Sequence, residues 1–369
     1  MSGVILKSVT CSLCLLNTIT SSSTLGFSSL RSPMKKMNST MKAIRIHSFG
    51  GPSVLKVENN VPRPIPSEGQ ILVRVHAAGI NPVDAQMREQ AFSFVPKLPL
   101  ILGKEVAGDV VEVVHGNDSS SDEHYKPGDR VICCLPCDSG YAEYVVCNIA
   151  DTLRLPSHVS YAEGAAIYVA YFTAYRGLIT KMQIRKDELV LVHGASGAVG
   201  MAAVQIAKAV GAVVVGTAGT DEGRQMVKDI GADYVVNHRD SSHLTQAIEM
   251  IPNCKGFDAI LENRATKNLA MDLRTLGPHG RIVVVGAKET VTIDPRFLIK
   301  TEGYITGVKM SDISTSQWKE YTAAITAGMV DGWLKPVIAR EYSMEEIQLA
   351  HKHLMQKHGH HGKLVLKIS

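Results

Sequence analysis

Hydrophobic and polar positions follow two different patterns in this chain, and the change comes near residue 162. Between Met41 and Glu163, apolar residues come in short alternating runs such as 71–75 (Ile-Leu-Val-Arg-Val), with turn residues such as 126–129 (Lys-Pro-Gly-Asp) between them. Alternation with a period of two predicts half-buried strands. Several short strands at this spacing predict a small, barrel-like unit of antiparallel strands.

After residue 162, apolar strands alternate with helices. Helices are predicted over Ala162–Lys181, Ala198–Val210, Asp221–Ile230, His243–Ile251 and Lys267–Leu276. Strands are predicted over Asp187–His193, Ala212–Thr217, Tyr234–Asn237, Phe257–Glu262 and Arg281–Gly286, with an edge strand near Val291–Ile293. This alternation predicts a doubly wound parallel sheet.

A mixed pattern returns after Thr301. Amphipathic helices are predicted over Gln317–Ala327 and Met344–Gln356, and a closing strand over Gly362–Ile368. The α/β unit is therefore expected to be inserted into the β-rich one. The predicted boundaries are 41–163 and 304–369 for the β-rich unit and 164–303 for the inserted unit.

Residues 1–40 differ from the rest and are predicted to be an N-terminal extension. They contain Lys7, Arg31, Lys35 and Lys36, many serines and threonines, and no acidic residue. This composition is typical of a mitochondrial transit peptide, and a disordered extension is the alternative. Without them, the 39 basic residues of the chain fall to 35 and equal the 35 acidic ones. A neutral body disfavours nucleic acid as the main partner.

The cysteines indicate a reducing compartment. They are seven, an odd number, and their spacing is irregular, so no disulfide framework is predicted. The expected location is cytoplasmic, with a mitochondrial location through residues 1–40 as the alternative. No run of about 18 uncharged apolar residues occurs, so no membrane span is predicted.

The strongest motif is a glycine-rich loop at 194–200 (Gly-Ala-Ser-Gly-Ala-Val-Gly), directly after the apolar strand 189–192. Such a loop lets the backbone approach a pyrophosphate, and the helix that follows offers free N–H groups and the positive end of its dipole. The spacing is G-x-x-G-x-x-G, a weak signal alone. The surrounding β and α pattern makes it a predicted dinucleotide site.

The end of the next strand indicates which dinucleotide binds. NAD sites usually carry an acid there that binds the ribose hydroxyls, and this chain has Ala218 at that place. Nothing there repels a 2′-phosphate, and Arg224, His238 and Arg239 are available to complement one. The expected cofactor is therefore NADPH, although these basic residues could instead be solvated surface.

Several stretches from Met41 to the C-terminus carry a family resemblance. They are 50–52 (Gly-Gly-Pro), 78–84 (Ala-Gly-Ile-Asn-Pro-Val-Asp), 127–131 (Pro-Gly-Asp-Arg-Val), 140–144 (Gly-Tyr-Ala-Glu-Tyr), 171–175 (Tyr-Phe-Thr-Ala-Tyr), 192–197, 217–220, 237–239 and 332–337. Together they resemble the zinc-free quinone oxidoreductases, the zeta-crystallin-like branch of the medium-chain dehydrogenase/reductase superfamily. The resemblance implies a Rossmann doubly wound parallel sheet inserted into a GroES-like β-barrel domain, in an α/β fold.

The resemblance also implies which residues contact NADPH. They are Ser196, Gly197, Ala198 and Val199 in the loop; Gly219 and His238 near the adenosine ribose; Asn268; Val285, Gly286, Ala287 and Lys288; and Val308, Lys309 and Met310. Gln86 is also expected to contact the cofactor, because it stands where the family usually has a tyrosine near the nicotinamide. Asn81 and Gln86 are expected to form the wall of the substrate site rather than to act as acid–base catalysts.

No metal site is predicted. Zinc-dependent relatives use a cysteine where this chain has Asn81, and a Gly-His-Glu segment where it has 103–105 (Gly-Lys-Glu). One Cys-x-x-Cys pair, Cys134 and Cys137, cannot complete a zinc site. The histidines near the C-terminus, 351, 353, 358, 360 and 361, suit a polar helix end better than a dedicated metal site.

The predicted function is metal-free reduction of a quinone by NADPH. Quinones accept electrons readily and need little acid catalysis, which agrees with a site that lacks an evident general acid. Two alternatives stay open: an NADPH-dependent enal or enone reductase, and a non-catalytic NADPH-binding protein that is crystallin-like or binds RNA. A homo-oligomer, dimeric or tetrameric, is expected because an exposed sheet edge favours pairing.

Overall fold

The computed structural model describes residues 39–91, 96–116, 124–135, 139–356 and 360–369. Most of the predicted N-terminal extension, residues 117–123, Cys137 and His358 lie outside the described residues. Among the described residues, no helix combines the length and the apolar character needed to cross a membrane.

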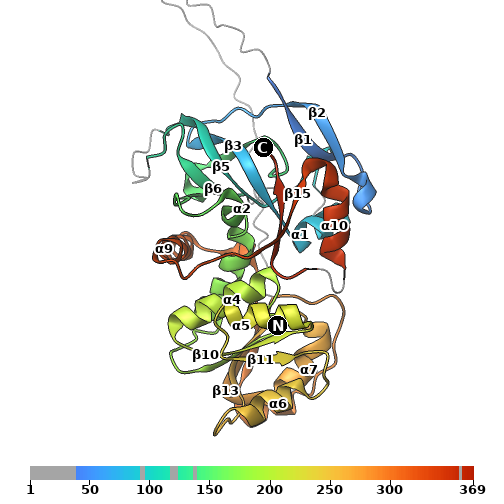
Figure 1. Cartoon of the computed structure of the whole chain (residues 1–369), viewed down its shortest axis with the longest axis vertical. Helices are drawn as coiled ribbons and strands as arrows, with labels where there is room; N and C mark the ends of the chain where they lie inside the picture. The colour runs from blue at the N-terminus through green and yellow to red at the C-terminus, as the bar shows by residue number, and fades with distance from the viewer. Residues whose placement is uncertain (1–38, 92–95, 117–123, 136–138, 357–359) are drawn as a thin grey trace, which may run out of the picture. The chain divides into compact units, whose positions relative to one another are not determined.

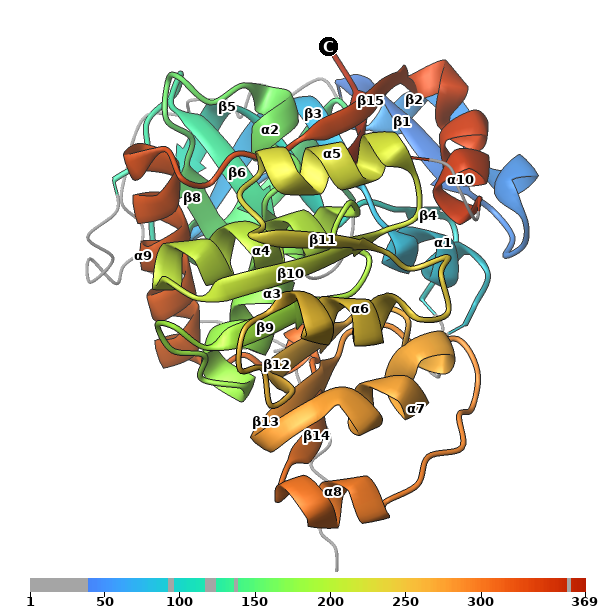
Figure 2. The same cartoon turned by 60° about the horizontal axis from the view of Figure 1, so that its bottom comes forward.

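The second half of the chain contains a six-stranded sheet in which every neighbouring pair is parallel. Its strands are β9 (Leu189–Val192), β10 (Val213–Ala218), β11 (Tyr234–Asn237), β12 (Phe257–Glu262), β13 (Leu276–Val284) and β14 (Tyr304–Gly307). They lie in the order β11-β10-β9-β12-β13-β14 (Figure 2). The predicted doubly wound fold is confirmed, because this order reverses direction between β9 and β12 as in dinucleotide-binding sheets.

Helices cover both faces of this sheet. They are α4 (Ala198–Val210), α5 (Asp221–Asp229), α6 (His243–Met250), α7 (Ala265–Thr275) and α8 (Arg296–Thr301). Helices α4 and α5 lie on one face, and α6 and α7 lie on the other (Figure 1). Helix α4 ends at Gly211, whose φ of 88° is the left-handed conformation that glycine favours at a helix end.

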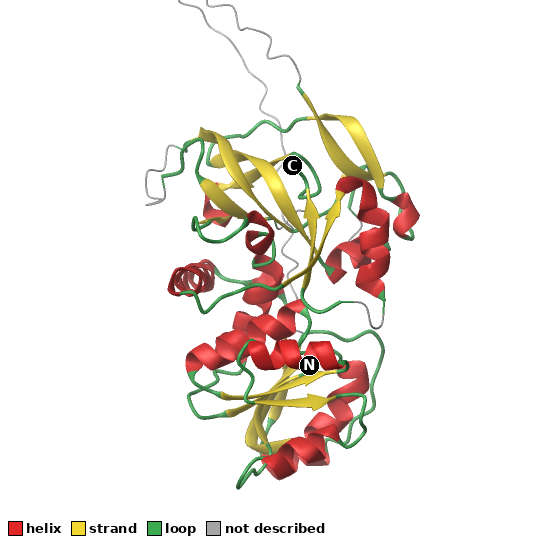
Figure 3. Ribbon diagram, in the orientation of Figure 1, coloured by secondary structure: helices red, strands yellow, loops and turns green. Residues whose placement is uncertain are grey.

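The first half of the chain and its last strands form a mostly antiparallel sheet, shown with the other strands in Figure 3. Its strands are β3 (Gln70–Ile80), β5 (Glu105–Val114), β6 (Arg130–Cys134), β7 (Tyr144–Asn148), β8 (Thr152–Arg154), β15 (Ile338–Ser343) and β16 (Lys363–Lys367). A smaller sheet holds β1 (Thr40–Ile46), β2 (Lys56–Pro62) and β4 (Leu100–Ile101). The strands from the two ends of the chain pair directly, β16 with β3, so the parallel sheet is an insertion.

Three further helices accompany the antiparallel sheet. They are α1 (Pro82–Arg88), α9 (Thr315–Asp331) and α10 (Ile347–Met355). Helix α1 starts with a capping box between Asn81 and Asp84, with Pro82 at its first position. Both features are typical helix starts.

The helix predicted over Ala162–Lys181 is interrupted. Short α-helical turns, α2 (Tyr161–Gly164) and α3 (Thr173–Tyr175), alternate with wider π-helical turns over Tyr168–Phe172 and Arg176–Lys181. The wider turn changes the local hydrogen bonding, and the Val169 N–H donates to a carboxylate of β5 instead. Residue periodicity alone does not distinguish these two kinds of turn.

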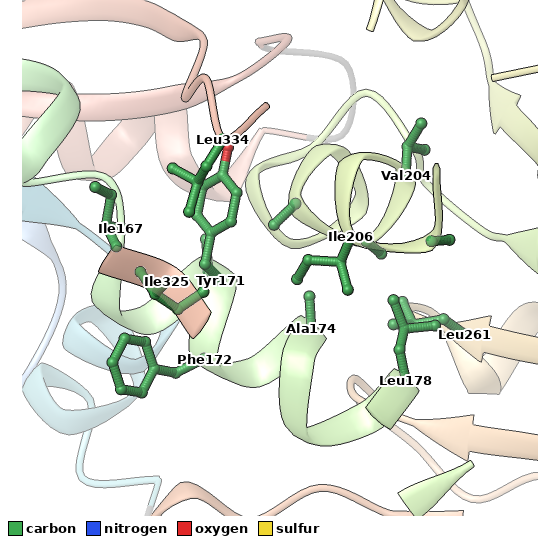
Figure 4. Packing of buried hydrophobic residues seen from close by; sticks show 14 of the residues in the cluster. Ile167, Tyr171, Phe172, Ala174, Leu178, Val204, Ile206, Leu261, Ile325 and Leu334 are labelled. Atoms are coloured by element: carbon green, nitrogen blue, oxygen red, sulfur yellow. The ribbon is translucent and has the colours of Figure 1, made fainter. Parts of the chain in front are cut away.

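The interrupted segment packs against α4 and the parallel sheet. Figure 4 shows Ala174 pointing toward Ile206 of α4, and Leu178 beside Leu261 of β12. Tyr171 is 2% exposed, and its hydroxyl donates to Gln205 of α4 at 2.8 Å. One apolar cluster therefore joins this segment, α4 and residues of the antiparallel sheet, including Ala107.

The sequence-based prediction of the edge strand is wrong. Val291–Ile293 has no strand structure, and both of its apolar residues pack as partly buried side chains near α7 and α8. Their alternation reflects an extended loop that packs on a cluster, not strand pairing. The edge strand at this end of the sheet is β14, which pairs with β13. The parallel sheet thus continues one strand beyond the predicted boundary at residue 303.

Candidate functional site

The glycine loop connects the buried strand β9 to helix α4. Gly194 has a left-handed backbone with φ of 61°, and its N–H donates to Thr217 Oγ1 at 3.1 Å. The Ala195 N–H donates to the Thr217 backbone oxygen at 2.8 Å. These contacts attach the loop to the end of β10 and define its turn.

The turn brings the start of α4 very close to the end of β9. A Cβ atom on Gly200 would lie 2.2 Å from the Gly194 backbone oxygen, so only glycine fits. Gly197 provides no side-chain cap to α4, which leaves the first N–H groups of the helix available. The predicted pyrophosphate-binding residues at this helix start are Ser196, Gly197, Ala198 and Val199. The arrangement fits an anionic pyrophosphate.

The other predicted cofactor residues lie beyond the carboxyl ends of parallel strands. Gly219 follows β10, His238 follows β11, Asn268 lies on α7 after β12, Val285, Gly286, Ala287 and Lys288 follow β13, and Val308, Lys309 and Met310 follow β14. Parallel strands bring their carboxyl ends to one edge, where open α/β sheets bind ligands. The structure therefore assembles these residues along one edge of the sheet.

Basic side chains surround the end of β10. Ala218, the last residue of β10, is buried and has no carboxylate of its own. A Cβ atom on Gly219 would lie 2.6 Å from His238 Nε2 and 3.0 Å from Arg239 Nε. Desolvation, followed by the charges of neighbouring histidines and arginines, lowers the pKa of His238 to about 4. At neutral pH His238 is therefore uncharged, and Arg239 supplies positive charge at this strand end.

The C-terminal segment reaches the same strand end. Thr220 caps helix α5 by accepting from the Gly223 N–H at 3.0 Å. Its Oγ1 also lies 2.8 Å from His361 Nε2. The two sheets are thus connected near the predicted adenosine site by a side chain from each side.

Three buried ionisable side chains lie behind the glycine loop, and we call them the strand-end cluster: His193, Glu262 and Asp272. Each is at most 1% exposed. His193 Nε2 lies 2.7 Å from Asp272 Oδ1 and 3.5 Å from Glu262 Oε2. Glu262 Oε1 also accepts from Asn268 Nδ2 at 3.2 Å. The cluster therefore orients a predicted cofactor residue.

Burial decides the charge of the strand-end cluster. Desolvation raises the pKa of Glu262 to about 8 and that of Asp272 to about 7, and it lowers the pKa of His193. Glu262 accordingly keeps a proton at neutral pH. Among the described residues, this is the one group of three such side chains spaced closely enough to hold a metal ion. The proton on Glu262 reduces the negative charge of the cluster without a metal ion.

The two predicted wall residues have different surroundings. Gln86 lies on α1 with its side chain exposed. Asn81 precedes α1 and is 2% exposed, and its Nδ2 donates to Glu105 Oε1 at 2.9 Å. Asn81 therefore has a fixed amide group, whereas Gln86 is open to an incoming molecule.

A second buried group, which we call the wall cluster, consists of Asn81, Glu105 and Lys363. The side chain of Lys363 is 3% exposed, and its ammonium contacts both Glu105 Oε1 and Asn81 Oδ1. Glu105 Oε2 accepts from the Val169 N–H at 2.9 Å. The carboxylate is thus buried with a cation and with hydrogen bonds to both of its oxygens.

Zinc does not fit these residues. Zinc takes thiolate, neutral imidazole or carboxylate ligands. The positions that would supply the first two hold Asn81 and Lys104. Glu105, the carboxylate of this segment, is already paired with the Lys363 ammonium. The cation at this place is a side chain of the protein itself.

The contacts of Cys134, His351 and His353 favour a structural role over a catalytic or metal-binding one. Burial raises the pKa of the Cys134 thiol, which opposes thiolate reactivity. His351 is 0% exposed, with Nδ1 3.0 Å from the Arg88 guanidinium. His353 Nδ1 lies 2.7 Å from the Tyr342 hydroxyl instead. The two histidines of α10 thus have separate partners.

The sequence analysis missed the strand-end cluster and the pairing of Lys363 with Glu105. His193 and Asp272 are 79 positions apart, and Lys363 and Glu105 are 258 apart. One signal was present for Lys363: a charged residue directly before the apolar run 364–366 at the start of a strand. This pattern indicated a cation at the start of an apolar strand but did not indicate which residue pairs with it.

Comparison with known proteins places the chain among oxidoreductases. Two family models match it: "Alcohol dehydrogenase GroES-like domain" over residues 67–174 and "Zinc-binding dehydrogenase" over residues 198–327. It is 42% identical over 328 residues to the quinone oxidoreductases of Pongo abelii and Homo sapiens. These alignments cover 89% of this chain and 98% of each relative.

Solved structures share the fold. An NAD-dependent alcohol dehydrogenase superposes with a TM-score of 0.80 at 28% identity, covering 89% of this chain and all of that one. The quinone oxidoreductase of Thermus thermophilus, described with its NADPH complex, gives 0.76 at 29% identity, with the same coverage. The GroES-like part expected from the sequence is confirmed by the first family model.

Proposed function

This chain belongs to the quinone oxidoreductase family of the medium-chain dehydrogenase/reductase superfamily, and from that premise we propose that it transfers reducing equivalents from NADPH to a quinone without a metal ion. The observation that carries the proposal is the edge of the parallel sheet. There an uncapped helix start and the ends of the flanking strands form a dinucleotide site.

We assign cofactor binding to the residues along that edge. Ser196, Gly197, Ala198 and Val199 would hold the pyrophosphate at the start of α4. Gly219, His238 and Arg239 would surround the adenosine ribose, where Ala218 offers no carboxylate to reject a 2′-phosphate. The charged Arg239 favours NADPH over NADH because the 2′-phosphate is an anion.

The protein contributes to the reaction by positioning the cofactor and the acceptor next to each other. When bound, NADPH supplies a hydride from its reduced nicotinamide ring. General acid catalysis is not required of the protein, since a quinone is already a strong acceptor. Asn81 and Gln86 would form the wall beside the acceptor, the first fixed by its hydrogen bonds and the second open. The two sheets would thereby divide the task, one binding the cofactor and the other the substrate.

The proposal is tested by following NADPH oxidation with a panel of quinones, enals and enones. We expect turnover with quinones, faster with NADPH than with NADH, and unaffected by chelators. Turnover confined to enals or enones would favour the alternative reductase. Cofactor binding without turnover of any acceptor would favour the non-catalytic alternative.

Assembly and location are separate proposals. We propose a homo-oligomer, dimeric or tetrameric, because β14 is an exposed edge strand and Ile299 on α8, the helix that precedes it in the chain, is 78% exposed. Light scattering that gives only the monomer mass at micromolar concentration would contradict it. We also propose a cytoplasmic location, with a mitochondrial one if residues 1–40 act as a transit peptide. A fluorescent fusion to those residues, followed by microscopy, distinguishes the two.

A further inference from the structure

The start of strand β16 contacts the glycine loop. The Gly362 N–H donates to the Ser196 backbone oxygen at 2.8 Å, and Gly362 forms a parallel bridge with Gly197. The next residue, Lys363, donates its N–H to the Val337 backbone oxygen at 2.8 Å. Backbone hydrogen bonds therefore hold the position of Lys363 relative to the predicted pyrophosphate loop.

The side chain of Lys363 extends to the wall instead. Strands β16 and β3 pair Leu364 with Ile80, so the next step in register places Lys363 beside Asn81. Asn81 Oδ1 accepts from the Lys363 ammonium, while Asn81 Nδ2 donates to Glu105. These two contacts define which way the amide of Asn81 faces. Lys363 thus connects two parts of the proposed site. Its neighbour Gly362 contacts the glycine loop through the backbone, and its own ammonium contacts the wall residue Asn81.

We propose that Lys363 is a positioning residue for hydride transfer, which holds the wall residue Asn81 in place relative to the glycine loop. This inference rests on the proposed function. Lys363 itself is buried within the wall cluster and acts through Asn81. Its effect is on geometry, and a misplacement of about 1 Å can cost roughly a hundredfold in rate.

The proposal predicts a separation between rate and cofactor affinity. A side-chain substitution at Lys363 leaves the Gly362 to Ser196 hydrogen bond in the backbone, so the loop keeps its support. The amide of Asn81 loses a partner that defines its orientation. We therefore expect the hydride-transfer rate to fall while the affinity for NADPH stays close to that of the parent.

The test variant removes both charges of the ion pair at once. Lys363→Met alone leaves a buried carboxylate without its cation, so Lys363→Met is combined with Glu105→Gln. Single-turnover NADPH oxidation should slow by roughly tenfold or more. NADPH deuterated at the transferred position should give a larger isotope effect than in the parent. The dissociation constant for NADPH, from fluorescence titration, should change less than about twofold.

A matched control removes another ion pair. Arg281 and Glu188 pair at 2.6 Å near the amino ends of the parallel strands, away from the glycine loop. Arg281→Met with Glu188→Gln makes the same change of charge and should keep the parent rate. Asn81→Ala completes a double-mutant cycle. If Lys363 acts through Asn81, adding Lys363→Met and Glu105→Gln, the charge-matched variant, to Asn81→Ala should slow the reaction little further.

The outcomes separate this inference from the proposed function. If the parent oxidises NADPH with none of the acceptors, the proposed function itself is refuted. If the parent is active and the charge-matched variant reacts at the parent rate, the positioning role alone is overturned. Additive losses of rate in the double-mutant cycle would overturn it too. If the charge-matched variant does not fold, Lys363→Arg keeps the charge and changes the geometry. It should then show the same slower rate, and a parent-like rate would overturn the role.

Discussion

The two sides of the proposed site each have a buried cluster of ionisable groups, and the two clusters balance charge differently. On the wall side, the Lys363 ammonium neutralises Glu105 directly. On the cofactor side, Glu262 and Asp272 share a site with His193, whose pKa burial lowers, so no permanent cation is present in that cluster. Bound protons therefore balance charge on the cofactor side, where an ammonium does so on the wall side.

This difference predicts how each cluster responds to substitution and to pH. Removing one partner of a buried ion pair leaves an uncompensated charge, which is strongly destabilising. A carboxyl that already holds a proton can be replaced by an amide of the same shape with little loss. The wall cluster should therefore be sensitive to substitution, and the strand-end cluster should be sensitive to pH.

The largest effect is expected for Lys363→Met alone. It leaves the buried Glu105 without its cation, at a cost of about 3–5 kcal/mol in the free energy of unfolding. That is a large share of the stability of a typical protein. Urea unfolding measures it, and Glu105→Gln added to Lys363→Met should recover most of the loss. A single variant as stable as the parent would show that Glu105 is neutralised in another way.

The next prediction concerns pH and Glu262. Its pKa is raised from 4.5 to about 8, and that of Asp272 from 3.8 to about 7. The folded state therefore binds more protons than the unfolded state between these values, so stability falls as the pH rises from about 4 to 8. Glu262→Gln should flatten this dependence by up to about 1.4 kcal/mol per pH unit.

Urea unfolding at pH 5 and pH 8 checks the prediction. Glu262→Gln should stay within about 1 kcal/mol of the parent at pH 5 and exceed its stability by much more at pH 8, whereas the exposed control Glu289→Gln should change neither. If a metal ion balanced the cluster instead, the substitution would destabilise at both values. The purified protein would then also contain stoichiometric metal.

Arg239 tests the cofactor side at the end of β10. Arg239→Ala should lower kcat/KM for NADPH by about tenfold to a hundredfold, the equivalent of about 1.5–3 kcal/mol for a hydrogen bond to a charged group. The value for NADH should stay the same, because NADH lacks the 2′-phosphate. Steady-state kinetics with both cofactors measure this, with the exposed Arg185→Ala as control. Equal losses with both cofactors would place Arg239 away from the phosphate.

Local patterns predicted most of the fold and the glycine-rich turn, whereas the individual cofactor contacts come from the family resemblance and stay predictions. Strand β9 and helix α4 flank this turn directly in sequence, so periodicity and glycine spacing were enough to predict the turn. The edge strand was misplaced because the alternation at Val291–Ile293 reflects loop packing, which looks the same as a strand in a short run. The pairing of Lys363 with Glu105 depends on three neighbouring strands and could not be read from local sequence.

The smallest predicted effect is at Gln86 on the wall side. Its exposed side chain lies on α1 without an aromatic face. If the acceptor stacks beside the nicotinamide, Gln86→Tyr should strengthen quinone binding by about 0.5–1.5 kcal/mol, a several-fold lower KM when substrate release outpaces chemistry. Gln86→Leu is the control, since it adds apolar bulk without a ring. The affinity for NADPH should change less, because its proposed contacts lie on the sheet edge. Unchanged quinone kinetics with weaker NADPH binding would mean that Gln86 faces the cofactor alone, and the wall would then be defined by Asn81.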